Sequence, residues 1–259
     1  MPEPQEEAAT QPSSPRPAPA RGLPRMTLER GRVLFVSSGA IGVTALPEWA
    51  LVLRFRYGWS VRVCLSYSAD RLVSRSALAA VTQAPVEGPD WPTERGVVPH
   101  QELAEWPDLV IAAPATTNFV AKCAAGMADS LVLTTVLCTA APVLIAPSIP
   151  ENALARPAVQ RNLRLLEEDG YHVVPMSPAV SAHRGTVSPS GMPGLPAILK
   201  VAARVLAKPE EPGEGEKPGE GEKSGEAEEK GKTEEKGRTE ESAEAEREGA
   251  AGTGGQPDG

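Results

Sequence analysis

The sequence has few of the residues that build disulfide frameworks, metal sites or membrane spans. Its 259 residues include three cysteines and three histidines, and only 4% are aromatic. The three cysteines, Cys64, Cys123 and Cys138, are odd in number and lack metal-type spacing, so we expect buried thiols in a reducing cytoplasm and not a disulfide framework. No apolar run reaches the roughly 18 residues that cross a bilayer, and the acidic N-terminus lacks the apolar core of a signal peptide. These absences predict a cytoplasmic protein with no metal site and no membrane contact.

Charge is concentrated at one end of the chain. Residues 208–259 carry 17 acidic and 8 basic side chains, a net charge of −9, whereas the whole chain carries −8. The rest is therefore almost neutral, which does not favour a nucleic-acid partner. Residues 208–259 repeat Glu, Lys and Gly without apolar β-branched or aromatic residues, so burial cannot offset their chain entropy. We expect a disordered N-terminal segment at 1–30, one folded domain at 31–207 and a disordered acidic tail at 208–259.

Short apolar runs rich in β-branched residues alternate with helical segments. The expected strands are GRVLFVSS (31–38), SVRVCLS (60–66), DLVIAA (108–113), APVLIA (141–146) and YHVVP (171–175). Glycine and proline punctuation predicts helices over 41–57, 69–80 and 157–169, and a loop over 83–99. Strands that are apolar on both faces and alternate with helices predict an α/β fold with a parallel sheet covered on two sides.

Small polar segments follow three of these strands, at the sheet edge where α/β folds bind ligands. In SSGAIG, Gly39 could serve a simple turn, or it could let backbone N–H groups approach an anion. In LSYSA, Ser66 and Ser68 could cap a helix or add hydroxyls to the same edge. In PATTN, Thr117 or Asn118 could cap the next helix, but that leaves the other residues unexplained. Three such loops at one edge favour a ligand site.

His100 is the candidate for proton transfer. It precedes the helix-forming stretch QELAEW, which leads into the strand DLVIAA. Histidine titrates near neutral pH, which suits proton transfer or carboxylate binding, although a lone histidine in a loop is usually only exposed. His172 falls inside a predicted strand and His183 in a Ser/Pro/Gly-rich stretch, so both rank below His100.

In this order the motifs resemble a known family, the homo-oligomeric flavin-containing cysteine decarboxylases. That family includes phosphopantothenoylcysteine decarboxylase and the enzymes that decarboxylate the C-terminal cysteine of lanthipeptide-like precursors. PATTNFVAKCAAGMADSL resembles the family's PASANT-type motif, HQEL resembles its HI-x-L element, and PAVQRNLRLLEEDGYHVV matches the segment that closes the fold. The resemblance covers residues 31–175. It implies a flavodoxin-like (Rossmann-type) three-layer fold that binds FMN, assembled as trimers or dodecamers with the flavin near a subunit interface.

The resemblance also implies roles for individual residues. His100 would be catalytic, near the carboxylate or thiol of the substrate. The residues around FMN would be Gly39, Ala40, Ile41, Ser66, Ser68, Pro114, Ala115, Thr116, Thr117, Asn118 and Ser130. Those near the substrate would be Met127, Pro150 and Asn152. The implied chemistry is oxidation of a substrate cysteine by FMN, followed by loss of carbon dioxide to give an enethiol.

Three departures from the family pattern bear on the substrate. Ala40 replaces the serine of a Gly-Ser-Ile turn, and Pro150 replaces the asparagine of a Pro-x-Met-Asn-x-x-Met-Trp motif, with Asn152 out of register. No cysteine follows Cys138, whereas the coenzyme A pathway enzyme uses one on a C-terminal flap. These departures favour oxidative decarboxylation of the C-terminal cysteine of a ribosomally made precursor peptide, giving an enethiol for an aminovinyl-cysteine ring.

If the substrate is such a precursor peptide, other peptide-modifying enzymes are candidate partners. Three alternatives stay open on the sequence. They are phosphopantothenoylcysteine decarboxylase of coenzyme A biosynthesis, a flavin prenyltransferase and a non-catalytic flavin-binding subunit.

Overall fold

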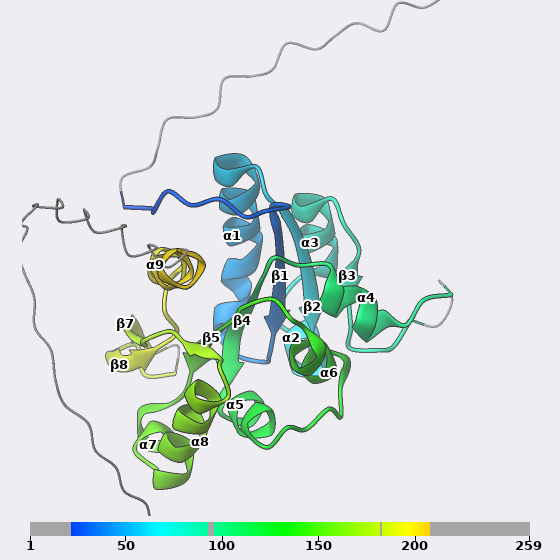
Figure 1. Cartoon of the computed structure of the whole chain (residues 1–259). Helices are drawn as coiled ribbons and strands as arrows, with labels where there is room; N and C mark the ends of the chain where they lie inside the picture. Colours follow the sequence, from blue (N-terminus) through cyan, green and yellow to red (C-terminus); the bar gives the residue numbers. More distant parts are fainter. Residues whose placement is uncertain (1–21, 93–95, 182, 208–259) are drawn as a thin grey trace, which may run out of the picture. The chain divides into compact units, whose positions relative to one another are not determined.

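The computed structural model describes residues 22–92, 96–181 and 183–207 (Figure 1). Residues 1–21 and the predicted acidic tail at 208–259 lie outside the described residues. Within the described part, no helix has the length and apolarity that a membrane span requires. The same residues contain no group of three or more His, Cys, Asp or Glu side chains arranged to hold a metal ion.

Six parallel strands form the central sheet in the order β3-β2-β1-β4-β5-β6. They are β1 (Arg32–Ser37), β2 (Ser60–Leu65), β3 (Val86–Glu87), β4 (Leu109–Thr116), β5 (Val143–Ser148) and β6 (His172–Val173). The chain runs outward from β1 to β3 and then returns to the other side of β1 with β4. The predicted flavodoxin-like, Rossmann-type α/β fold is confirmed. The reversal leaves a crevice at the carboxyl ends of β1 and β4, where such folds bind ligands.

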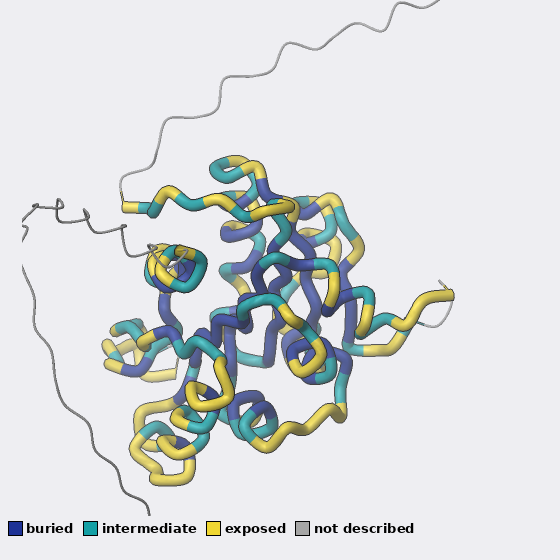
Figure 2. The backbone as a smooth tube through the Cα atoms, viewed as in Figure 1, coloured by how far each residue is buried: buried dark blue, intermediate teal, exposed yellow. Residues whose placement is uncertain are grey.

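Helices cover both faces of the sheet (Figure 1). One face is covered by α1 (Leu46–Val52), α3 (Arg75–Thr82) and α9 (Leu195–Leu206). The other is covered by α4 (Pro99–Glu105), α5 (Thr117–Ala124), α6 (Leu131–Cys138) and α8 (Pro157–Glu168). Because side chains alternate along a strand, Val33 and Phe35 of β1 join the first core and Leu34 and Val36 the second. The strands are therefore buried on both sides, as Figure 2 shows.

Two predicted helices are divided in the structure. The segment predicted over 41–57 consists of the 3-10 helix η1 (Ile41–Ala45), α1 and the π-helical turn η2 (Leu53–Tyr57), and Gly58 ends it with a φ of 69°. The segment predicted over 69–80 consists of α2 (Tyr67–Asp70) and α3. Ser66 and Ser74 each accept a hydrogen bond from a backbone N–H three residues on, so each begins a separate helix.

Several elements depart from the sequence predictions. The predicted loop at 83–99 contains β3, where Val86 and Glu87 are buried. Strand β4 extends to Thr116, so the first residues of PATTN are strand and not loop. After residue 175, where the sequence analysis assigned no elements, the structure has the antiparallel hairpin β7 (Ser177–Val180) and β8 (Val187–Gly191), and then α9. The short helix α7 (Glu151–Leu154) precedes α8.

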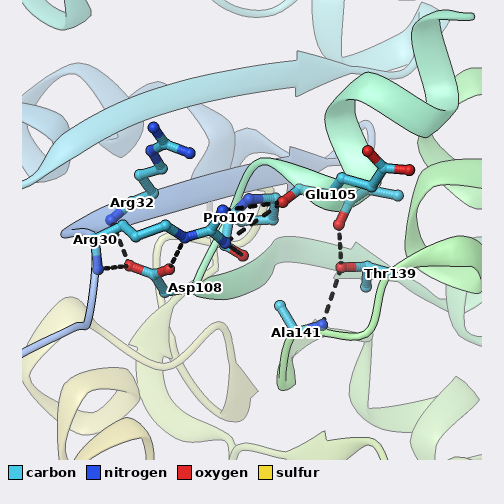
Figure 3. Close-up of polar contacts among 8 residues, drawn as sticks. Arg30, Arg32, Glu105, Pro107, Asp108, Thr139 and Ala141 are labelled. Carbon is cyan, nitrogen blue, oxygen red and sulfur yellow. Dashed lines mark hydrogen bonds and ion pairs between the residues drawn. The ribbon is translucent and has the colours of Figure 1, made fainter.

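The packed domain begins before the predicted boundary at Gly31. Leu23, Met26 and Leu28 pack against the first core. The Arg30 side chain lies 2.8 Å from the Asp108 carboxylate and donates a 3.0 Å hydrogen bond to the Pro107 carbonyl (Figure 3). Residues 22–30, predicted as part of a disordered segment, therefore lie as a strap across the amino ends of β1 and β4.

Candidate active site

A cavity of about 670 Å³ opens at the carboxyl ends of β1, β4 and β5. It lies at the reversal point of the sheet, and its volume falls in the range of about 300–1,000 Å³ that is usual for small-molecule sites. Four segments form its walls: the turn after β1, the start of α5, the connection from β5 to α7, and the β7–β8 hairpin. The lining residues include Gly39, Ala40, Ile41, Gly42, Thr116, Thr117, Asn118, Pro150, Ser188, Ser190 and Met192.

No charged side chain lines this cavity among the described residues. Its polar groups are hydroxyls, one side-chain amide and the backbone; the side chains are those of Thr44, Thr116, Thr117, Asn118, Ser148, Ser181, Ser188 and Ser190. An anion bound here would therefore be held by N–H and O–H donors and not by an ion pair within this chain.

Gly39 lets the first turn pack closely against the next helix. A Cβ added to Gly39 would lie 2.2 Å from the Ser68 Cβ and 3.0 Å from the Ser68 backbone carbonyl carbon. The requirement for glycine is therefore space. Ser68 lies behind the turn that lines the cavity, and the Ser66 hydroxyl caps α2. Neither serine lines the cavity itself.

Two serines join the end of β1 to the end of β4. Ser37 Oγ donates to the Ala113 carbonyl at 2.6 Å, and Ser38 Oγ donates to the Pro114 carbonyl at 2.8 Å. The Thr116 N–H donates back to Ser38 Oγ at 2.8 Å, and the two hydroxyl oxygens are 3.1 Å apart. The sequence analysis did not single out Ser38. The only sequence feature that could have indicated Ser38 is its position as a polar residue at the end of a predicted buried strand.

The start of α5 is capped by Thr116, not by Thr117 or Asn118. Thr116 Oγ1 accepts a hydrogen bond from the Phe119 N–H at 3.3 Å. Thr117 and Asn118, which the sequence analysis suggested as caps, therefore do not cap α5, and both line the cavity.

The other predicted cofactor and substrate residues do not line the cavity within one chain. Ala115 is buried inside β4, and the Pro114 carbonyl is occupied by Ser38. Ser130 precedes α6, Met127 is exposed in the preceding loop, and Asn152 lies in α7. Of the three predicted substrate residues, the structure brings only Pro150 to the cavity.

His100 is the second residue of α4 and also lies outside the cavity. Its Nδ1 atom is buried and has no hydrogen-bond partner among the described residues. The imidazole packs edge-on against Trp91, with the ring centroids 5.4 Å apart. The predicted catalytic histidine and the predicted flavin loops are therefore separate within a single chain.

The buried thiols are not suited to nucleophilic chemistry. Burial raises the pKa of Cys64 far above its usual range and raises that of Cys123 to about 12. A thiol reacts as the thiolate, so both remain inert near neutral pH. The prediction of buried thiols is wrong for Cys138, which is exposed because it is the last residue of α6, and it lies outside the cavity.

Comparison with known proteins assigns the family. Residues 23–206 match the family model described as Flavoprotein. The chain belongs to this family. The solved structure of SpaF, described as an FMN-dependent cysteine decarboxylase, is 33% identical with a TM-score of 0.56, over 66% of this chain and 97% of SpaF. The predicted family and its flavin cofactor are thereby confirmed.

Two further relatives come from different biosynthetic routes. TvaF, described as an FMN-dependent cysteine decarboxylase from thioviridamide biosynthesis, is 31% identical with a TM-score of 0.52, over 55% of this chain and 88% of TvaF. The coenzyme A biosynthesis bifunctional protein CoaBC of Bacillus subtilis (strain 168) is 36% identical over 146 residues, or 56% of this chain and 36% of CoaBC. The chain thus spans about a third of the length of this curated relative. The chain thus belongs with flavoprotein decarboxylases, and these two relatives are named for different biosynthetic routes.

Proposed function

We propose that this protein is an FMN-dependent oxidative decarboxylase that acts on the C-terminal cysteine of a ribosomally made peptide. Its product would be an enethiol, the precursor of an aminovinyl-cysteine ring. The observation that carries the proposal is the uncharged cavity at the carboxyl ends of β1 and β4. The identity to SpaF and TvaF, which extends over most of each of those chains, supports the substrate class.

The cavity residues fit FMN. Two neighbouring segments, 39–42 and 116–118, offer backbone N–H groups and hydroxyls where doubly wound sheets receive a phosphate. FMN, when bound, supplies the two-electron acceptor for oxidation of the cysteine. The chain itself would bind and orient the flavin; the residues proposed to hold it are Gly39, Ala40, Ile41, Thr116, Thr117 and Asn118.

His100 would reach the reacting cysteine from a neighbouring copy of the chain. Within one chain it lies outside the cavity, so the complete site needs the cavity of one copy and α4 of another. Such a contact joins two different surfaces, and it closes into a ring such as a trimer. Exposed apolar side chains near α4 support this interface: Trp91 is 42% exposed, Val97 44% and Val98 48%. In this homo-oligomer, a trimer or dodecamer, the ring nitrogen other than buried Nδ1 would move a proton at the substrate.

The match to CoaBC favours a second candidate function, decarboxylation of phosphopantothenoylcysteine. That substrate carries a phosphate in addition to the flavin phosphate. The described cavity lining offers no cationic side chain to receive it. No cysteine follows Cys138 in the sequence to assist a reduced flavin in returning its electrons to the enethiol. The peptide substrate therefore fits these residues better.

The test combines a spectrum with a mass measurement. The purified full chain should show flavin absorption near ~370 and ~450 nm, and it should remove about 46 mass units, two hydrogens plus carbon dioxide, from peptides ending in cysteine. Matched peptides ending in serine should stay unchanged. Loss of about 44 mass units from phosphopantothenoylcysteine, with peptides unchanged, would support the second candidate. A flavin-loaded protein that changes neither substrate contradicts both.

A further inference from the structure

An arginine buried in the sheet holds the helix that carries His100. Arg62 of β2 donates from Nη1 to Glu102 Oε1 of α4 and from Nη2 to Glu87 Oε1 of β3, each at 3.0 Å. The Arg62 side chain is 10% exposed, the Glu87 side chain 5% and the Glu102 side chain 35%. One guanidinium thus connects β2 and the edge strand β3 to α4.

Arg62 is itself held in place. Its strand is hydrogen bonded between β1 and β3, with Arg62 opposite Leu34. Its guanidinium lies 5.4 Å from the ring centroid of Trp106, and a planar guanidinium with two carboxylate partners has little freedom to rotate. When Glu102 is replaced, the pair with Glu87 still holds Arg62 in position.

His100 has no comparable anchor. Its Nδ1 is buried without a hydrogen-bond partner among the described residues, and its ring contact is the packing against Trp91. The amino end of α4 is not capped either, because the N-cap residue Val98 makes no side-chain hydrogen bond to the helix. The position of the imidazole therefore follows from the position of α4 and from Trp91. Glu102 lies only two residues from His100 on this seven-residue helix.

We propose that Arg62 and Glu102 are positioning residues for His100. Their ion pair sets the place of the amino end of α4 and so aims the imidazole that the proposed reaction uses. The catalytic meaning of this arrangement rests on the proposed function, whereas the positioning itself is a property of the folded chain.

The other end of α4 provides a matched control. There the Arg30 side chain pairs with Asp108 and donates to the Pro107 carbonyl, as Figure 3 shows. Asp108 follows α4, and its hydrogen bonds among the described residues go to Arg30 and Arg32 and not to His100. Loss of this second pair should loosen the strap without turning the imidazole.

The first experiment measures the chemical reactivity of each histidine. Flavin-loaded full-length protein is treated with diethyl pyrocarbonate, and the modification rates of His100, His172 and His183 are followed by mass spectrometry of the peptides. In Glu102→Ala, the rate at His100 should change several-fold while the other two stay as in the wild type. Glu102→Gln keeps a carbonyl acceptor for Arg62 and should restore most of the wild-type rate. Asp108→Asn should leave all three rates unchanged.

The second experiment measures turnover of a cysteine-terminated peptide. Glu102→Ala should lower kcat about tenfold with FMN still bound and KM little changed, because a displaced catalytic group slows the chemical step. If the wild type leaves every such peptide unchanged, the proposed function is wrong. The modification rates of the histidines still show whether Arg62 and Glu102 position His100.

The proposal is overturned if Glu102→Ala leaves the His100 rate unchanged in properly folded protein. It is equally overturned if Asp108→Asn changes that rate as much as Glu102→Ala does. Arg62→Lys, which retains the charge but loses the two-pronged contact, should reproduce the effect of Glu102→Ala and gives a second route to the same answer.

Discussion

The cavity after β1 and β4 and the surroundings of α4 are built from opposite kinds of residue. The described lining of the cavity has hydroxyls, an amide and backbone, and no charged side chain. Near α4 lie two separate sets of ion pairs, Arg62 with Glu87 and Glu102, and Arg30 with Asp108. The two regions therefore have different physical tasks. One presents hydrogen-bond donors to a ligand, and the other fixes the position of a short helix.

The charge difference suits the proposed chemistry. A fixed cation beside the substrate carboxylate would stabilise the ground state more than the transition state, in which that charge is being dispersed, and would slow decarboxylation. A neutral cavity avoids this. A helix of only seven residues has little stability of its own, so α4 takes its place from tertiary contacts, which here combine the burial of Leu103 in the second core with the ion pair from Glu102 to Arg62.

The largest effect is expected from His100→Ala, which tests whether the flavin cavity and the surroundings of α4 have separate tasks. Turnover of a cysteine-terminated peptide should fall by roughly 10²- to 10⁴-fold, the usual contribution of a general acid or base. The flavin should be retained, because His100 does not line the cavity. Absorbance of the bound flavin and the rate of mass loss are measured on the same preparation, with His172→Gln as the control histidine. Loss of the flavin would show that the two regions are not separate, and unchanged turnover would show that His100 is not a catalytic residue.

Much of the sheet could be predicted because buried parallel strands appear in the sequence as continuous apolar runs. β1, β2, β4 and β5 lie within two or three residues of their predicted ranges. β3 could not be found, because its two residues lie among prolines and one of them is a glutamate that is buried through its pair with Arg62. The hairpin strands contain Ser, Pro and Gly and give no strand signal.

The candidate site could likewise be predicted only in part. Glycine and small polar residues at strand ends predicted the turn at 39–41 and the segment at 116–118, which the fold brings to one cavity. Ser38 could not be assigned from sequence, because its partner Pro114 is 76 residues away. The separation of His100 from the cavity is equally a property of the tertiary fold, and no local pattern records it.

A smaller effect is expected from Ser38→Ala. The change leaves the Thr116 N–H without its partner and removes one of the two hydrogen bonds to the Pro114 carbonyl, which keeps the one from the Ser38 N–H. This should weaken FMN binding about tenfold, or ~1.4 kcal/mol, within the usual cost of an unsatisfied donor. Titration of apoprotein with FMN, followed by flavin fluorescence, gives the affinity. Ser37→Ala is the matched control, because it removes a buried hydroxyl of the same type that contacts Ala113 and not Thr116. An equal loss of affinity in both variants would mean that the effect is general loosening of β1.

The smallest expected effect concerns the strap and its pH dependence. Burial acts to raise the pKa of Asp108, but hydrogen bonds from the Arg30 side chain and from the backbone N–H groups of Arg32 and Arg30 outweigh burial and lower it. A carboxyl whose pKa is lowered by folding stabilises the native state above its unfolded pKa, about 3.9, and this stability is lost as the pH falls through the folded value. Because Arg30 is 44% exposed, the pair contributes only about 1 kcal/mol, so Asp108→Asn should lower Tm by roughly 2–4 °C at pH 7.

That Tm difference should shrink steadily below about pH 4, because the wild-type carboxylate then takes up its own proton. Calorimetry of both proteins across this range measures the change, and FMN affinity at pH 7 should be equal in the two, because Asp108 is remote from the cavity lining. A Tm difference that persists unchanged in acid would mean that the strap is held by hydrogen-bond geometry and not by charge. The contrast between the uncharged cavity and the charged surroundings of α4 would then rest on the Arg62 ion pairs alone.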